Sequence, residues 1–156
     1  MKNSILIILV FTILSNADFT RDDDKEIVTD NITKLQWDDK DYYPDDDDVN
    51  SEFFKNFDEA IDFCENSDLG GYNDWRLPNV NELKTIVNIN KYNLAIFDKF
   101  KNTSKEYKEY WTSTSDMTET NKFFYITFLN GLIDTKSKIG TEYDSISVRC
   151  VRFEKE

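Results

Sequence analysis

The chain contains no histidine among its 156 residues. This absence excludes a Ser-His-Asp triad, a histidine-activated cysteine and any metal site that depends on imidazole ligands. Positive charge is also scarce, because 19 Lys and Arg stand against 31 Asp and Glu and leave a formal net charge of −12. An acidic surface does not attract nucleic acid phosphates or anionic lipid. We therefore expect neither as a partner, and solubility explains the acidity most simply.

Long hydrophobic runs are missing as well, except for one at the N-terminus. Lys2 precedes an apolar run over residues 5–14, and residues 15–17 place small side chains at the minus-three and minus-one positions of a cleavage site. The run is about half as long as the roughly 20 apolar residues of a membrane-spanning helix. Residues 1–17 are therefore predicted to be a signal peptide that is cleaved before Asp18. The mature protein would be exported, to the periplasm, the cell surface or the medium.

The mature chain is expected to form one domain. Removing 17 of the 156 residues leaves 139, which can bury roughly two thirds of the unfolded surface around a single core. No repeat or linker interrupts this length. The acidic residues 18–26 are predicted to be a flexible lead-in, and residues 27–153 the folded domain.

Turn residues and apolar periodicity predict an α+β fold. The polar segment 38–51 reads as a loop, residues 88–107 read as irregular, and Asn130-Gly131 is a strong hairpin signal, because both residues tolerate a positive φ. The predicted strands surround these segments, at residues 26–30, 35–37, 110–114, 123–128, 132–137 and 145–153.

Two helices are predicted in the middle of the chain. Asn56 can cap the first helix, which residues 70–71 end. Asn79 can cap the second, and Glu82 is placed to complete a capping box with it. Leu83 begins the apolar face of the second helix.

Only two cysteines are present, and both fall on core-facing positions. Cys64 shares one helical face with Phe57 and Ile61, at a spacing of i, i+4 and i+7. Cys150 alternates with Val148 onto one face of the last strand. Because oxidation is the default in exported proteins, we predict a Cys64–Cys150 disulfide. It would close a loop of more than eighty residues and stabilise the fold by about 4 kcal/mol in the chain-entropy model.

Five segments in this order resemble the Lcl C-terminal domain family, a bacterial family long classed as a domain of unknown function. The segments are residues 30–37, 60–64, 71–83, 110–114 and 148–152. Together they span about residues 27–153. The resemblance implies a C-type-lectin-like fold, in which two helices lie beside twisted antiparallel sheets.

In the collagen-like adhesin for which the family is named, the domain is associated with sulfated polysaccharide binding and with trimer formation. This chain differs from that adhesin in two respects. It has no collagen-like repeat, and its net charge does not suit a strongly anionic glycan. It also carries Lys34 where the family usually has glycine.

The most family-specific segment is residues 74–78. Trp75 and Leu77 are predicted to lie in the core, Arg76 to hydrogen-bond nearby carbonyls, and Pro78 to set up the start of the second helix. In the alternative interpretation, Asp74 and Arg76 contact a ligand.

Three further residues of the family motifs are interpreted as mainly structural. Trp37 and Trp111 are predicted to pack in the core, as aromatic residues on strands usually do. Arg149 lies beside Cys150 in the last motif.

An acidic cluster in the predicted loop could supply oxygen ligands to Ca²⁺. It comprises Asp45, Asp46, Asp47 and Asp48, with Asp38, Asp39 and Asp41 before them. Four consecutive aspartates lack the spacing of a calcium loop, and no glycine and terminal glutamate of an EF-hand accompany them. A solvated acidic loop is preferred, and no metal or cofactor is expected.

The preferred function is that of an exported, non-catalytic binding module. Its loops, held on a rigid lectin-like scaffold, would recognise a glycan or an envelope or extracellular protein. A structural or assembly component of the cell envelope, acting through protein contacts alone, is the alternative. A carboxylate-dependent hydrolase is a third possibility, although 31 acidic residues create close carboxylate pairs by abundance alone.

Overall fold

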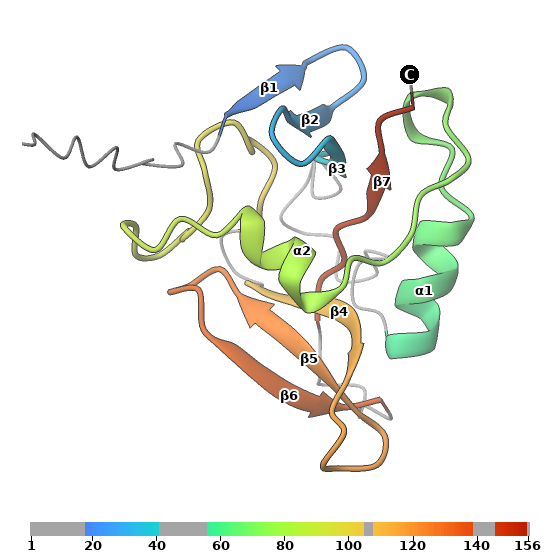
Figure 1. Ribbon diagram of the computed structural model, residues 1–156, viewed down its shortest axis with the longest axis vertical. Helices are drawn as coiled ribbons and strands as arrows, with labels where there is room; N and C mark the ends of the chain where they lie inside the picture. Colours follow the sequence, from blue (N-terminus) through green and yellow to red (C-terminus); the bar gives the residue numbers. More distant parts are fainter. Residues whose placement is uncertain (1–17, 41–55, 105–107, 139–145, 156) are drawn as a thin grey trace, which may run out of the picture.

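The computed structural model describes residues 18–40, 56–104, 108–138 and 146–155. The predicted signal peptide and the run Asp45–Asp48 lie outside these ranges. The described residues form two antiparallel sheets, two α-helices and one short 3₁₀ helix (Figure 1). The predicted α+β class is confirmed, whereas the relationship to C-type lectins stays a prediction.

The first sheet joins the two ends of the domain. Its strand order is β1-β2-β3-β7, and its strands are β1 (Phe19–Asp22), β2 (Ile27–Asp30), β3 (Leu35–Asp38) and β7 (Val151–Phe153). The predicted lead-in over residues 18–26 is wrong where β1 pairs with β2. Phe19 explains the difference, because its side chain is buried against Phe97 and Phe100. The acidic residues around Phe19 in the sequence do not indicate this burial.

A tight turn connects β2 to β3. The Asp30 side chain accepts hydrogen bonds from the backbone N–H groups of Ile32 and Thr33, at 2.9 and 3.2 Å. Lys34 then adopts a φ of 61°, in the left-handed region that glycine enters most easily. A glycine in this position would therefore relieve backbone strain, which gives a physical reason for the family preference noted above.

The two α-helices are α1 (Phe57–Glu65) and α2 (Val80–Thr85), and the 3₁₀ helix η1 (Leu69–Gly71) follows α1. Both predicted caps are confirmed. Asn56 and Glu59 form a capping box on α1, and Asn79 and Glu82 form one on α2. Each box satisfies backbone N–H groups that the first turn of a helix leaves without partners.

The second sheet consists of β4 (Glu109–Ser115), β5 (Lys122–Thr127) and β6 (Ile133–Ser137), in that order. The hairpin predicted at Asn130-Gly131 joins β5 to β6. Gly131 has a φ of 79°, and a Cβ added there would lie 2.6 Å from Val87 Cγ1. Glycine is thus required both by the turn and by the close approach of the loop that follows α2.

The last segment differs from the continuous strand predicted over residues 145–153. In its described part, residues 146–153, only residues 151–153 form a strand, while Ser147 makes one parallel bridge to Tyr110. Both sides of the segment are buried, with Ser147, Arg149 and Cys150 each at most 3% exposed. The predicted strand had one face toward the core, with Val148 and Cys150 on it. The observed segment lies between the two sheets, so both of its faces are covered.

Two groups of buried side chains form the core. One lies between the first sheet, α2 and β5, around Trp37, Leu83 and Ile126. The other lies between α1 and β4, around Trp111 and the two cysteines. The predicted disulfide is confirmed: Cys64 and Cys150 are bonded, fully buried and 5.4 Å apart between Cα atoms.

Loss of this bond should destabilise the fold strongly. The bond joins residues 86 positions apart, so in the chain-entropy model the Cys64→Ala/Cys150→Ala variant should lose about 4 kcal/mol of unfolding free energy. Urea unfolding of the oxidised protein and the double variant measures the difference. Equal midpoints and slopes for the two proteins would contradict the expectation.

Candidate functional site

The three family-motif tryptophans lie in the core. Trp37, Trp75 and Trp111 are each at most 2% exposed. Trp75 also donates a hydrogen bond from Nε1 to the Leu69 carbonyl, at 3.0 Å. This bond fixes the connector between η1 and α2 against the start of η1.

Arg76 makes one long hydrogen bond to a carbonyl, as predicted, but its shorter bonds go to a carboxylate that the prediction did not include. Its two terminal nitrogens lie 2.8 and 2.7 Å from the Glu82 oxygens, whereas the Leu77 carbonyl is 3.5 Å away. Glu82 also accepts the Asn79 N–H at 2.9 Å. Burial alone would raise the pKa of Glu82, but the bonds from Arg76 and Asn79 outweigh it and lower the pKa. A planar guanidinium forms two parallel hydrogen bonds to a planar carboxylate but only one to a carbonyl, which explains why Arg76 lies closer to Glu82 than to the Leu77 carbonyl.

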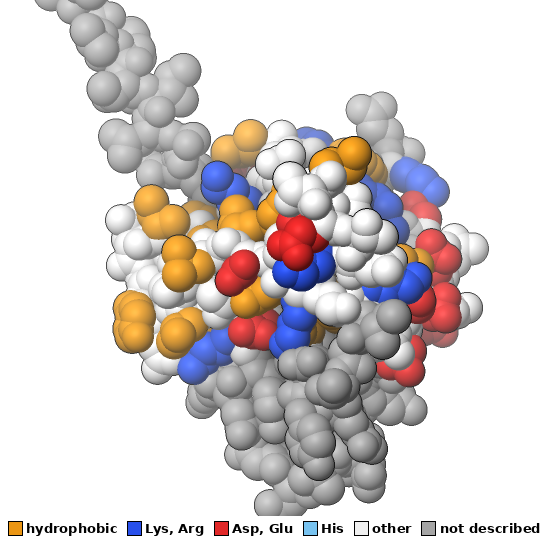
Figure 2. Space-filling view, turned by 90° about the horizontal axis from the view of Figure 1, so that it is seen from below, with side chains coloured by type: hydrophobic (Ala, Val, Ile, Leu, Met, Phe, Trp, Pro, Cys, Tyr) orange, Lys and Arg blue, Asp and Glu red, His pale blue; other side chains and the backbone are white. Residues whose placement is uncertain are grey.

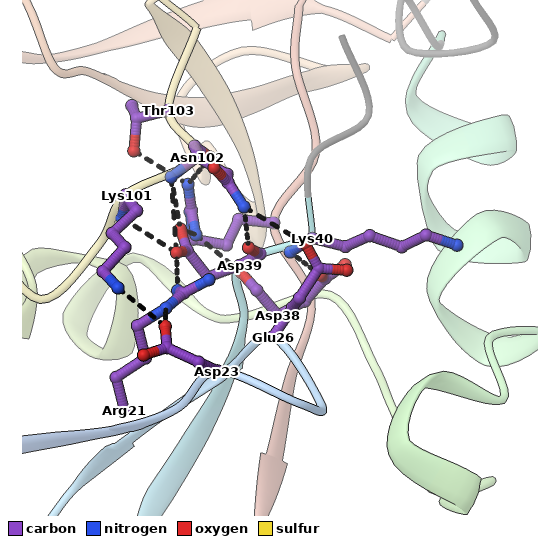
Figure 3. A network of polar contacts seen from close by, with 10 residues as sticks. Arg21, Asp23, Glu26, Asp38, Asp39, Lys40, Lys101, Asn102 and Thr103 are labelled. Atoms are coloured by element: carbon purple, nitrogen blue, oxygen red, sulfur yellow. Dashed lines mark hydrogen bonds and ion pairs between the residues drawn. The ribbon is translucent and has the colours of Figure 1, made fainter. Parts of the chain in front are cut away.

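Asp39 lies at the centre of a buried polar network (Figure 3). Its carboxylate accepts hydrogen bonds from Arg21 and, at 2.8 Å, from Arg149, and both arginine side chains are nearly inaccessible. The backbone N–H of Lys101 donates to the same carboxylate at 2.8 Å. Asp38 and Asp39 are 2% and 1% exposed, so the predicted solvated loop is wrong for these two residues.

Arg149 ties this network to the loop after residue 100. Its guanidinium donates to the Asp38 carbonyl at 2.6 Å, to the Asn102 carbonyl at 2.9 Å and to Thr103 Oγ1 at 3.0 Å. Burial disfavours the charged form, but Asp39 and its neighbours outweigh burial and raise the pKa of Arg149. The network is therefore an internal clamp in which the Asp39 carboxylate is already occupied by the protein's own cations, although Arg149 Nε has no hydrogen-bond partner among the described residues.

A surface hollow of about 270 Å³ lies where parts of β3, η1 and β7 meet. The first half of β3 contributes one wall, the end of η1 with the connector after it the second, and the end of β7 with the residues that follow it the third. Its lining residues are Gln36, Gly71, Tyr72, Asn73, Asp74, Arg152, Glu154 and Lys155.

Arg152 organises the hollow from its base. The guanidinium lies 3.7 Å from the centre of the Tyr72 ring, and Nε donates to Asp74 at 2.6 Å. A further nitrogen donates to the Gln36 side-chain oxygen. Only 4% of the Arg152 side chain is exposed, whereas 72% of the Lys155 side chain is. The buried arginine thus holds three lining side chains in fixed orientations.

Asp74 is an ionised hydrogen-bond acceptor at neutral pH and lies at the rim. Its hydrogen bonds from Arg152 and, at 2.8 Å, from Lys155 lower its pKa from 3.8 to about 2. A general acid needs the opposite shift, toward the working pH. Asp74 is therefore suited to accept hydrogen bonds from a ligand and unsuited to donate a proton.

A second hollow, of about 430 Å³, lies along α1. It is mainly acidic, with Glu59, Asp62 and Asp68 against the single cation Lys40 among its lining residues. One family segment, residues 60–64, contributes to its lining, whereas three of the five segments meet at the hollow around Tyr72. We therefore take the hollow around Tyr72 as the candidate site.

The described residues contain no group of His, Cys, Asp or Glu side chains that could hold a metal ion. No helix within the same ranges has the length and apolarity needed to cross a membrane. The calcium candidates Asp45, Asp46, Asp47 and Asp48 lie outside these ranges.

The sequence indicated part of this site and missed the rest. Asp74 was singled out as a possible ligand contact, and it lies at the rim. Gln36, Tyr72 and Arg152 were missed as site residues, although all three fall in the motif segments. Arg152 and Asp74 are separated by 78 positions, so no local spacing could have indicated their pairing.

Comparison with known families gives one match over most of the chain. The family described as the Lcl C-terminal domain matches residues 26–152. The matched segment includes Gln36, Tyr72, Asp74 and Arg152 of the hollow and both cysteines. No curated protein matches the chain.

The ionisation of Asp74 gives a pH prediction. Because its pKa is lower in the folded protein than the ordinary 3.8, its bonds stabilise the fold above about pH 4, and this contribution is lost as the pH falls toward 2. Carboxyl NMR titration should show a midpoint for Asp74 near 2. Lys155→Ala should move this midpoint upward, and Lys122→Ala, which removes a lysine at the opposite end of the domain, should leave it unchanged. A wild-type midpoint near 3.8 would contradict the geometry.

Proposed function

Because the chain belongs to the Lcl C-terminal domain family, we propose that it is an exported, non-catalytic binding module. Of the ligand classes considered, the hollow around Tyr72 favours a glycan. The observation that carries this proposal is the grouping of one aromatic ring with an amide, a carboxylate and cationic side chains in one concave surface. The buried disulfide supports export, since such bonds persist in oxidising compartments.

The polar groups of the hollow suit a hydroxyl-rich ligand. Sugar hydroxyls both donate and accept hydrogen bonds. Asp74 offers carboxylate oxygens, Asn73 an exposed amide, and Lys155 an exposed ammonium group. Charge-assisted hydrogen bonds of this kind are stronger than neutral ones. The ring of Tyr72 adds an aromatic wall, although Arg152 already lies close to the ring.

The hollow is organised before any ligand binds. Arg152 is held by Asp74 and Gln36, and the neighbouring Val151 exchanges two backbone hydrogen bonds with Arg76, both at 2.9 Å. A preorganised site loses less conformational entropy on binding. This rigidity supports recognition through a small number of contacts.

The carboxyl groups nearest the family motif support binding over hydrolysis. Glycoside hydrolysis needs one carboxyl group with a raised pKa to act as a general acid. The pKa values of Asp74 and Glu82 are lowered, because each carboxylate is bonded to an arginine. Neither group is suited to that role at neutral pH.

A polysaccharide panel tests the proposal. Oxidised protein over residues 18–156 should bind some members of the panel, and Asn73→Ala and Lys155→Ala should each weaken binding about tenfold, the loss expected for one charged or well-placed hydrogen bond. Lys122→Ala changes the net charge as Lys155→Ala does, at the other end of the molecule, and should have no effect.

Two results would contradict the proposal. If no polysaccharide binds, with or without calcium, the glycan proposal fails. If a polysaccharide binds but both hollow variants retain full affinity, the hollow is not the binding site.

A further inference from the structure

The hollow around Tyr72 is lined by equal numbers of positive and negative side chains. Arg152 and Lys155 carry the positive charges, and Asp74 and Glu154 carry the negative ones. The chain as a whole has a formal net charge of −12. The hollow is therefore electrically balanced within an acidic protein, and its charges attract neither an anionic nor a cationic ligand by their sum.

Asp74 already binds both cations of the hollow. One of its carboxylate oxygens accepts a hydrogen bond from Arg152 Nε at 2.6 Å, and the other accepts one from Lys155 Nζ at 2.8 Å. The Arg152 side chain is only 4% exposed and donates to Gln36 as well. An anionic group that entered the hollow would therefore compete with a carboxylate of the protein for both cations.

The negative charges of the hollow reach the surface. The Asp74 side chain is 27% exposed, and the bonds from Arg152 and Lys155 lower its pKa to about 2, so the carboxylate is ionised at neutral pH. The Glu154 side chain is 43% exposed, and the Lys34 ammonium group lies 3.9 Å from it. A sulfate or carboxylate of a ligand would face both of these groups, and like charges brought together in an interface suppress binding.

The turn between β1 and β2, beside the hollow, does not add an excess of positive charge. Its Lys25 ammonium group lies 3.5 Å from the Tyr72 hydroxyl. Residues 22–24 before it and Glu26 after it are all acidic. On the face seen in Figure 2, acidic and basic side chains of the described residues are likewise interspersed. A polyanion is attracted by clustered cations, and mixed charges of this kind do not provide them.

We propose, on the basis of the proposed function, that the hollow selects uncharged polysaccharides over those that carry sulfate or carboxylate groups, and that Asp74 determines this specificity. An ammonium group has three donors and a carboxylate has about four acceptor sites. A sugar hydroxyl can therefore bond to Lys155 or Asp74 while the two stay paired. A sulfate that bonds to Lys155 would lie against the Asp74 carboxylate, and this repulsion discriminates between the two ligand classes.

Polysaccharides that differ only in charge test the proposal, with oxidised protein over residues 18–156. Each neutral polysaccharide that binds is compared with its own sulfated and carboxymethylated derivatives, as dextran is with dextran sulfate and carboxymethyl dextran. Isothermal titration calorimetry at about 0.15 M salt keeps the screening of distant charges constant. The wild type should bind the neutral parent at least about tenfold more tightly than either derivative.

Two variants remove one negative charge each from the hollow. Asp74→Asn keeps the size of the side chain and one acceptor oxygen, and it should shift the ratio of affinities at least about tenfold toward the charged derivatives. Glu154→Gln changes an exposed side chain and should shift the ratio by about threefold in the same direction. Asp134→Asn makes the same substitution at an exposed position of β6, at the other end of the domain, and should leave the ratio unchanged. Circular dichroism checks that each variant is folded, and Glu154→Gln carries the test if Asp74→Asn does not fold.

Two kinds of failure are distinguishable. If neither the neutral parents nor their derivatives bind, the proposed function fails and the selectivity with it. If a charged derivative binds the wild type as tightly as its neutral parent, or more tightly, and Asn73→Ala weakens both, the hollow binds glycans but the selectivity is overturned. A ratio that stays unchanged in the folded variants would also overturn the role of Asp74.

Discussion

The buried guanidinium of Arg149 is the constraint on which the rest of the structure depends. A charged group inside a protein is tolerated only when partners replace the water it has lost. Arg149 obtains these partners from Asp39 at the end of the first sheet and from the Asn102 and Thr103 loop. Segments more than forty positions apart in the sequence are therefore held together at one point. Asp39 is neutralised from two sides, because Arg21 of β1 binds it as well.

The residues that follow Arg149 extend this connection to the candidate site. Cys150 is bonded to α1, Val151 exchanges backbone hydrogen bonds with Arg76, and Arg152 contacts Asp74 and the Tyr72 ring. Four consecutive residues thus anchor four separate parts of the chain. The walls of the hollow belong to elements that are fixed to this one segment, so its shape follows from the same contacts that stabilise the fold.

Local signals in the sequence predicted the elements that depend on neighbouring residues. Asn56 and Asn79 specified both helix starts, and Gly131 specified the hairpin between β5 and β6. Cys64 and Cys150 could be paired because each faced the core by its own periodicity. Contacts between distant residues had no such signal. Asp39 belongs to an acidic segment, and nothing in the local sequence distinguishes it from the other aspartates, because Arg21 and Arg149, which bind it, lie elsewhere in the chain. The hollow likewise depends on Arg152 meeting Asp74. The strand β1 was missed because a single buried phenylalanine decides its position.

Amide hydrogen exchange tests the central role of the segment around Arg149 most directly. The N–H groups of Asp38, Arg76 and Val151 bond to or within this segment, at 3.0, 2.9 and 2.9 Å, and the N–H of Thr127 makes a bond of 2.9 Å in the β5–β6 hairpin. Because these lengths are similar, differences in exchange report how each region opens. The account predicts that the first three amides exchange only through global unfolding and more slowly than Thr127. Exchange of Asp38, Arg76 and Val151 that is as fast as that of Thr127, or faster, would contradict it.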